Sequence, residues 1–514
     1  MKDKIPFPDE RRIKRLHRHF SAFQRMMALL TALALLLTSC SSGKQDSSDE
    51  SNIVLPEPSA QERQMILGDN VSSTGQEITL YYIADGSSEL TSVTRSIQIE
   101  GDESLIERVL DELLNFSEGK LHGLPADTQI LDVESSCGTV TVNLSINTGS
   151  QLSEQETLLR SLSISNTLLS IEGVRAVNIL TGGRSEAVCS LPLGVITRQI
   201  DSAPTQYAQF QTERDHFLIS GNSSISREAL LYYPSSDGAY LIPELRSLGF
   251  SSENYASVVL QALQAEPANS SLCFSSATSA AETLLTEPKI YANEVGERVV
   301  DINFSAMLPN HLAFSGIEPW QFYGSLVLSL CSFVPELDAV RISLDGEPVE
   351  SCMAKGKQIS FTNKLMRRKD FEHLIGASSA LHFSDASGNL VRVERAMPMS
   401  RAASAKGLLS EMISSAAPAG CTSVFPASIY ADDILGVYVE NRIASVNLSG
   451  NFYSRCQSLS AGQERNLIYG MVNTLAELPG IGAVRFLVEG MSVESLAQNI
   501  YLKTSLLPDP EMAG

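Results

Sequence analysis

The sequence has few aromatic residues and no apolar segment of membrane-spanning length. Aromatic side chains make up 6% of the 514 residues, tryptophan occurs once, and hydrophobic residues make up 43%. An uncharged apolar run at residues 26–37 is shorter than the roughly 20 residues that a spanning helix requires. This composition is typical of a globular protein and unlike that of a membrane transporter.

Basic residues and paired cysteine motifs are also scarce. The formal net charge is −21, and an acidic surface repels phosphate backbones, so nucleic-acid binding is disfavoured. The eight cysteines form no C-x-x-C motif and no paired Cys/His spacing. We interpret the seven cysteines beyond the N-terminal segment as small buried hydrophobic residues with one or two disulfides, and we expect no metal site.

The chain lacks the motifs that carry common catalytic chemistry. It contains no G-x-S-x-G, no phosphate loop and no H-E-x-x-H, so neither a nucleophile elbow nor a zinc helix is indicated. The histidines beyond the N-terminal segment occupy unrelated positions; they are His122, His216, His311, His373 and His382. We therefore expect no catalytic residue, no cofactor and no small-molecule substrate.

The N-terminal segment has the organisation of an export signal. A basic stretch precedes the apolar run, and small residues follow it. The ending Leu37-Thr38-Ser39-Cys40 resembles the lipobox of bacterial lipoproteins. That resemblance implies cleavage before Cys40, a diacylglycerol on its thiol, and a protein held on the extracytoplasmic face of the cell membrane. An ordinary signal anchor with an incidental cysteine is the alternative.

A short strand sequence ending in Asn-x-Ser occurs three times. It reads V-T-V-N-L-S at 140–145, V-D-I-N-F-S at 300–305 and A-S-V-N-L-S at 444–449. In an exported bacterial chain these triplets are not expected to carry glycans. We predict that Asn143, Asn303 and Asn447 tie off the end of the strand, because asparagine readily bonds nearby backbone groups.

The strand belongs to a longer repeated module. Each copy opens with two β-rich runs around a glycine turn, at 78–95, 229–246 and 379–395, which predicts a hairpin. An amphipathic helix follows, then the Asn strand, a second helix and a strand containing Ala-Val. Capping boxes are predicted at Ser104/Glu107, Ser153/Glu156 and Ser460/Gln463.

This order, β-β-α-β-β-α-β, predicts an α+β fold of three tandem modules. Each module is expected to hold a mixed sheet with two helices packed on one face. The ranges are a signal at 1–39, a flexible stalk at 40–74, modules at 75–190, 226–350 and 376–497, linkers at 191–225 and 351–375, and a tail at 498–514. The second linker holds Lys364, Arg367, Arg368 and Lys369. A solvated linker is the favoured interpretation, and docking on an acidic neighbour is the alternative.

One charged position also recurs. Arg95, Arg246 and Arg395 close the second strand of each hairpin. Three guanidinium groups could present carboxylate-binding forks to a partner. The favoured interpretation is that each pairs with an acidic residue inside its own module.

The combined pattern resembles the GerMN-domain family of sporulation and germination lipoproteins. The resemblance rests on L-Y-Y-P…D-G-x-Y-L-I-P-E-x-R in the second copy, the V-x-V-N-L-S strand, and x-N-T-L-x-E-x-P-G-I-x-x-V-R-F-L-V-E-G in the third. It covers most of residues 75–497. It implies a compact α/β module and an accessory part of a spore-envelope assembly.

These observations favour a non-enzymatic lipoprotein that is a structural or interaction component of the cell envelope in sporulation or germination. Its expected partners are the membrane, through Cys40, and envelope or sporulation-complex proteins. A cell-wall (peptidoglycan) enzyme or regulator, with a site formed between modules, is the alternative. A solute-binding lipoprotein is disfavoured, because such proteins need two lobes around a cleft rather than tandem repeats.

Overall fold

The structure is a computed structural model that describes residues 76–97, 104–124, 128–146, 152–220 and 224–509. The predicted signal, the stalk and Cys40 lie outside these residues. Within the described residues no helix combines the length and the apolar character needed to span a bilayer. All of the described residues fall within one compact unit.

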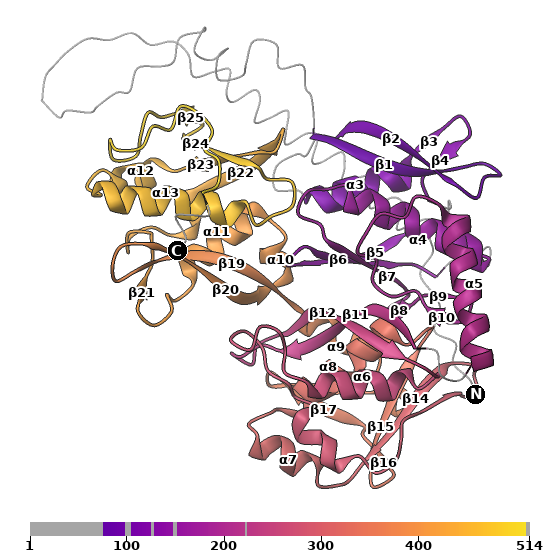
Figure 1. The fold of residues 1–514 in the computed structure, drawn as a ribbon. Helices are drawn as coiled ribbons and strands as arrows, with labels where there is room; N and C mark the ends of the chain where they lie inside the picture. Colours follow the sequence, from indigo (N-terminus) through magenta and orange to yellow (C-terminus); the bar gives the residue numbers. More distant parts are fainter. Residues whose placement is uncertain (1–75, 98–103, 125–127, 147–151, 221–223, 510–514) are drawn as a thin grey trace, which may run out of the picture. The chain divides into compact units, whose positions relative to one another are not determined.

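The first module begins with a hairpin and ends with a second, separate sheet (Figure 1). Its elements are β1 (Gln76–Ala84), β2 (Leu90–Ile97), α3 (Leu105–Asn115), β3 (Ser117–Glu118), β4 (Leu121–His122), β5 (Ile130–Ser136), β6 (Thr139–Leu144), α4 (Glu154–Leu169), β7 (Ala176–Thr181) and β8 (Arg184–Ser185). The short strands β9 (Ala187–Val188) and β10 (Leu191–Pro192) and the helix α5 (Ala203–Ser220) follow.

The second module repeats this order with additional short helices. Its elements are β11 (Ile225–Pro234), β12 (Leu241–Phe250), α6 (Tyr255–Gln264), η1 (Thr278–Thr283), β13 (Lys289–Ala292), β14 (Arg298–Phe304), α7 (Leu308–Phe314), α8 (Pro319–Phe333), β15 (Ala339–Leu344) and β16 (Glu347–Pro348). It is followed by β17 (Ser351–Ala354), β18 (Lys357–Ser360), η2 (Thr362–Lys364), α9 (Arg368–Phe371) and η3 (Glu372–Leu374).

The third module has the same plan. Its elements are β19 (Gly376–Asp385), β20 (Leu390–Pro398), α10 (Met399–Ala402), α11 (Ala405–Ser414), β21 (Cys421–Thr422), η4 (Ala431–Asp433), β22 (Ile434–Glu440), β23 (Ile443–Leu448), α12 (Gly450–Cys456), α13 (Ala461–Leu475), β24 (Ala483–Val488) and β25 (Met491–Ser492).

The predicted α+β class and the order of elements are confirmed, but the strands of each module form two sheets rather than one. The hairpin is one sheet, and the Asn strand and the Ala-Val strand form the parallel centre of the other. In the first module Val140 pairs with Val177 across this centre. The regular spacing between the two motifs therefore reflects one β-α-β connection in each copy.

The connecting helix is buried on both sides, because it lies between the hairpin and the second sheet (Figure 1). In α8 every residue from 320 to 333 is buried, and in α4 every residue from 158 to 168. A helix enclosed in this way is expected to lack a polar face. The sequence prediction assigned α4 a single apolar stripe, whereas its serines and threonines are buried as well.

These buried hydroxyl groups satisfy the free edge of the hairpin. The Tyr81 N–H donates to Thr167 Oγ1 (2.9 Å), and the Ser163 hydroxyl donates to the Tyr81 carbonyl (2.6 Å). In the second module the Tyr232 N–H donates to Ser329 Oγ (2.9 Å), and the Ser325 hydroxyl donates to the Tyr232 carbonyl. An unpaired edge at this depth would cost free energy, so the helix supplies partners that a third strand would otherwise provide.

The three repeated asparagines have the predicted structural role. The side-chain oxygens of Asn143, Asn303 and Asn447 each accept a hydrogen bond from a backbone N–H in the turn after the Ala-Val strand. The donors are Gly183 (2.8 Å), Gly346 (2.9 Å) and Gly490 (2.7 Å). Each of these glycines has positive φ, a conformation that favours glycine.

The predicted helix caps are confirmed at two of three places. Ser153 with Glu156 and Ser460 with Gln463 form complete capping boxes. Ser104 occupies the N-cap position of α3, but its side chain makes no cap hydrogen bond.

A strap after each module pairs with its Ala-Val strand. The main-chain groups of Val177 and Ile196 exchange two hydrogen bonds, and those of Val340 and Met366 do the same. Val484 and Leu506 form the third pair. Residues expected to lie in linkers and in the C-terminal tail therefore complete the second sheets. Single bridges in irregular segments have no periodicity, so the sequence pattern did not predict them.

We predict that Ser329→Ala lowers the free energy of unfolding by about 1–3 kcal/mol, because it leaves the buried Tyr232 N–H unpaired. Urea unfolding followed by circular dichroism measures the change. Ser252→Ala is the control, since Ser252 is exposed in the same module. Equal effects of the two substitutions would contradict this role for the hydroxyl.

A second prediction concerns pH. His382 replaces the tyrosine of the other hairpins; it is buried and its Nδ1 lies 3.0 Å from Thr474 Oγ1. Burial lowers the pKa of His382 to about 4. The unfolded chain therefore binds this proton more tightly, so stability is full above about pH 6.5 and is lost as the pH falls toward 4.

The expected loss from His382 is on the order of 3 kcal/mol. Carboxylates also titrate in this range, so the informative quantity is the difference between the wild-type protein and His382→Asn, which retains a polar atom near the Nδ1 position. We expect a flatter stability curve between pH 6.5 and 4 for this variant. His311→Asn is the control, and a wild-type slope in His382→Asn would refute the assignment.

Candidate functional site

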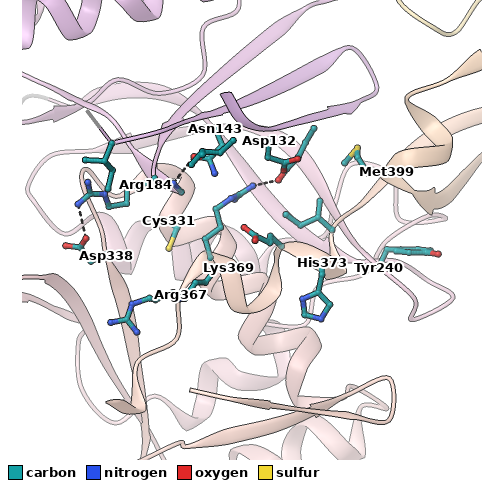
Figure 2. Close-up of a pocket in the computed structure, with 18 of the residues that line it drawn as sticks. Asp132, Asn143, Arg184, Tyr240, Cys331, Asp338, Arg367, Lys369, His373 and Met399 are labelled. Carbon is teal, nitrogen blue, oxygen red and sulfur yellow. Dashed lines mark hydrogen bonds and ion pairs between the residues drawn. The ribbon is translucent and has the colours of Figure 1, made fainter. Parts of the chain in front are cut away.

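A cavity of about 770 Å³ lies where segments of all three modules meet (Figure 2). The first module contributes strand β5 and the turn between β7 and β8. The α9–η3 segment forms another wall, and residues 398–400 at the start of α10 close it. Its volume falls in the range of small-ligand sites. We call it the inter-module pocket.

A buried ion pair forms the floor of the inter-module pocket. The Arg368 guanidinium donates to Glu134 Oε1 at 2.5 Å, and both side chains are almost fully buried. Arg368 also donates to the hydroxyl groups of Tyr232 and Ser332, each at 3.3 Å. Because Glu134 belongs to β5 and Arg368 to α9, this pair joins the first module to the segment that follows the second.

Burial raises the pKa of the Glu134 carboxyl, and the neighbouring charges of Asp132 and Glu372 raise it further, against the lowering effect of Arg368. Asp132 and Glu134 are two residues apart on β5 and point to the same face of the strand. Glu134 Oε2 is buried without a hydrogen-bond partner in the described structure. Four acidic and four basic side chains line the pocket: Asp132, Glu134, Asp338 and Glu372, and Arg184, Arg367, Arg368 and Lys369.

Two further ion pairs border the pocket. Arg184 donates to Asp338 at 2.8 Å, linking the β7–β8 turn to the second module (Figure 2). Arg367 pairs with Glu297, also at 2.8 Å. Among the described residues, Asp132, Glu372 and Lys369 line the pocket without forming any ion pair.

The remaining wall is apolar. Leu131 and Ile146 line the pocket with 55% and 52% of their surface exposed. Ile375 and Met399 also line the pocket. Apolar side chains this exposed beside charged groups are typical of binding sites.

The interpretation of the basic residues at 351–375 as part of a solvated linker is wrong for Arg368, for which the structure shows the alternative, docking on an acidic neighbour. Lys364 and Lys369 are exposed. Arg368 is only 4% exposed, and it pairs with Glu134 of the first module. The first linker likewise contains the folded helix α5. A cluster of basic residues does not reveal its partner, because Glu134 lies 234 residues away in the sequence.

The three recurrent arginines stay within their own modules and form no common site. Arg95 lies 3.7 Å from Glu112, and Arg246 pairs with Glu244. Arg246 also donates to the Glu266 carbonyl (2.5 Å), and Arg395 donates to the Ala416 carbonyl (2.6 Å).

Each guanidinium also lies over an aromatic ring of its own module; the rings are Phe116, Tyr233 and Phe383, at 4.4, 5.9 and 5.7 Å from the ring centroids. These contacts hold the hairpin against the end of the following helix. Partner binding by these arginines stays a prediction.

Other candidate chemistry is sparse in the described residues. No three His, Cys, Asp or Glu side chains there are arranged to hold a metal ion. The seven cysteines of the described chain are free thiols, so the expected disulfides do not form. Burial raises the pKa of the Cys273, Cys331 and Cys456 thiols to about 12, as expected for inert packing residues.

Sequence reasoning missed Asp132, Glu134 and Glu372. The sequence contained one signal of these residues. In I-L-D-V-E-S-S, at 130–136, acidic residues alternate with apolar ones, which is unexpected in a strand that borders the hydrophobic core. An acidic side chain that faces the core requires a cation. The basic cluster at 364–369, for which the sequence indicated no partner, contains that cation.

A family model described as Germane, sporulation and spore germination, matches residues 79–187, 230–350 and 380–494. No curated protein matches the chain. The tandem GerMN domains of the sporulation protein GerM from Bacillus subtilis match with 14% identity over 56% of this chain and 98% of that chain, with a TM-score of 0.24.

Two shorter structures match about a quarter of the chain. The first GerMN domain of the same Bacillus subtilis protein is 19% identical over 26% of this chain and 97% of that chain, with a TM-score of 0.22. A putative lipoprotein from Clostridium perfringens is 19% identical over 26% and 89%, with a TM-score of 0.19. The three family-model matches together span more than half of the chain.

We predict that Arg368→Met lowers the free energy of unfolding by about 3–5 kcal/mol, because it leaves Glu134 buried without its cation. The double variant Glu134→Leu/Arg368→Met should recover most of this loss. Unfolding in urea, with limited proteolysis between the modules, measures both effects.

Arg367→Met is the matched control, since its ion pair with Glu297 is more exposed. We expect it to cost no more than about 1 kcal/mol. If the double variant is as unstable as Arg368→Met, the loss does not come from an uncompensated charge at Glu134.

Proposed function

This chain belongs to the Germane family of sporulation and spore germination proteins, and we propose that it is a non-enzymatic lipoprotein of the bacterial cell envelope. In this proposal Cys40 carries a lipid that holds the protein on the extracytoplasmic face of the membrane. The modules then form a structural and interaction component for envelope or sporulation-complex proteins. The family membership confirms the resemblance noted in the sequence.

The repetition of one family module carries the proposal. Of the three matched copies, the first is joined to the second and to the segment after it through the Arg184–Asp338 pair and the buried Arg368–Glu134 pair. The Ser378 N–H of the third copy donates to Ser136 Oγ of the first. Links of this kind restrict motion between modules, which suits a spacer of defined length. The repeated polar residues serve the hairpin edge and the turns, and they leave no set of catalytic groups in common.

A lipid on Cys40 is supported by the L-T-S-C sequence alone. The expected attachment places the described modules beyond a polar stretch of about 35 residues, from 40 to 74.

One observation favours the alternative, a peptidoglycan enzyme or regulator with a site between modules. The inter-module pocket contains Asp132, Glu134 and Glu372, and paired carboxylates are the usual acid and base of glycoside hydrolysis. Glu134, however, is engaged by Arg368 and buried in the floor. A general acid must reach the reacting oxygen, so the arrangement favours the non-enzymatic function.

The test is deletion of the gene, complemented by the wild-type chain and by Cys40→Ala. We expect a loss of spore yield or of germination that the wild-type chain restores and Cys40→Ala does not, because the variant is not lipidated. Spore counts and germination rates measure this, and detergent extraction of membranes measures anchoring.

Normal sporulation and germination of the deletion strain would contradict the proposed process. Release of the wild-type protein from membranes without detergent would contradict the anchor. Hydrolysis of purified peptidoglycan by the wild-type protein, abolished in Asp132→Asn, would replace the proposal with the enzymatic alternative.

A further inference from the structure

We propose that helix α7 (Leu308–Phe314) docks on the surface of a phospholipid bilayer, with Met307 and Phe314 inserted between the lipid headgroups. The proposal rests on the lipid anchor proposed for Cys40, which would hold the chain at that surface. Its basis is an exposed apolar face on a short helix at the periphery of the second module (Figure 1). We call this face, which Met307 and Phe314 form, the α7 tip.

The helix itself brings the two side chains of the α7 tip together. Met307 has helical backbone angles, and the His311 N–H donates to its carbonyl at 3.1 Å. Residues seven positions apart lie on one side of a helix, so Met307 and Phe314 share a side. Phe314 is 95% exposed and Met307 is 52% exposed. Leu308 and Leu312 are buried, and they fix the helix against its module.

The corresponding helix of the third module shows that the fold does not require this apolar face. Counted from the repeated asparagines, α7 and α12 bury the same two positions. At the positions of Met307 and Phe314 the third module has Asn451 and Ser458, which are exposed. The matching segment of the first module, 147–154, lies partly outside the described residues. A module of this kind therefore folds with polar residues where α7 presents two large apolar ones.

The α7 tip also carries no charge. No Asp, Glu, Lys or Arg occurs between Asp301 and Glu318, although the formal net charge of the chain is −21. The Glu318 carboxylate accepts a hydrogen bond from the indole N–H of Trp320 at 2.6 Å, so it is engaged at the start of α8. Anionic headgroups repel an acidic chain. An uncharged tip can enter the headgroup region without the cost of burying a charge there.

The size of the α7 tip favours a bilayer over a protein partner. The helix has seven residues and is therefore about 10 Å long. A stable protein interface buries about 800 Å² on each partner, which is far more than two side chains on so short a helix offer. A bilayer contact needs no such minimum, because the anchor already confines the chain to the membrane.

The proposed anchor brings the bilayer within reach of the modules. A stretch of about 35 residues, from 40 to 74, separates Cys40 from the described modules. A chain of that length spans at most about 120 Å. Confinement within this distance gives the bilayer a high effective concentration, so a contact too weak to recruit the protein alone is still populated. Docking of the α7 tip would therefore orient the second module rather than attach it.

The test transfers the lipidated chain from detergent to phosphatidylcholine vesicles and places a tryptophan at the tip by Phe314→Trp. Ser458→Trp, at the equivalent position after α12, is the matched control, and the buried Trp320 is common to both. We expect the emission of Phe314→Trp to shift to shorter wavelength on vesicles. Lipids brominated in the upper acyl chain should quench it, since interfacial side chains lie about 5–10 Å into the headgroup and acyl boundary. Ser458→Trp should show neither change.

Met307→Asn introduces the residue of the third module at the other apolar position. In the Phe314→Trp background it should shift the docking equilibrium toward the free state by about fourfold for each methylene group withdrawn from the bilayer. The loss of quenching measures this shift. Both side chains are exposed, so the fold should tolerate the substitutions, and an unchanged unfolding midpoint checks this.

The proposal is overturned if the protein floats with the vesicles but Phe314→Trp is quenched no more than Ser458→Trp. A dimer in sedimentation that Phe314→Ser abolishes would assign the α7 tip to a second copy and would also overturn it. A wild-type chain that does not float with vesicles refutes the lipid anchor, together with the docking that depends on it. Flotation and quenching therefore distinguish failure of the docking alone from failure of the proposed function.

Discussion

Each module depends on one helix that has no solvent-exposed side, and this constraint explains why apparently unrelated residues recur. Because α4 and α8 lie between two sheets, a polar group on any face of either helix must find a partner. Ser161 and Ser165 find theirs in carbonyl groups of α4, and Ser161 also bonds Glu186. Ser163, Thr167 and Ser329 instead find theirs in the free edge of the hairpin. The same contacts stop that edge from pairing with another chain, a known hazard of exposed strands.

The second constraint acts between modules rather than within them. Arg368 and Glu134 are buried together although they belong to different parts of the chain, and such a pair costs stability if either partner is lost. Replacing both by apolar residues would be tolerated, so the pair specifies which surfaces meet more than it adds to stability. The straps at Ile196 and Met366 attach part of each connecting segment to the second sheet of the preceding module.

Much of the fold could be predicted from the sequence, because hairpins, capping boxes and the β-α-β spacing are local patterns. The sequence predicted that Asn143 bonds nearby backbone groups at the end of its strand, although it did not identify Gly183 as the donor. The order of the elements alone did not predict the division into two sheets. The apolar stripe of α4 indicates an amphipathic helix, and only the structure shows that serines of this helix face a strand edge. The pocket could not be predicted from the sequence, because Glu134 and Arg368 lie far apart in the chain and meet only in the folded structure.

Comparison of the three modules also distinguishes residues that the common fold requires from residues that occur in one module only. The asparagines, the arginines that close the hairpins and the helix hydroxyls recur, and each has an internal contact that accounts for it. Glu134 does not recur, because strand register places Lys289 and Tyr438 at its position in the other two modules. The presence of Glu134 in the first module has a structural reason, because Glu134 forms the buried ion pair with Arg368.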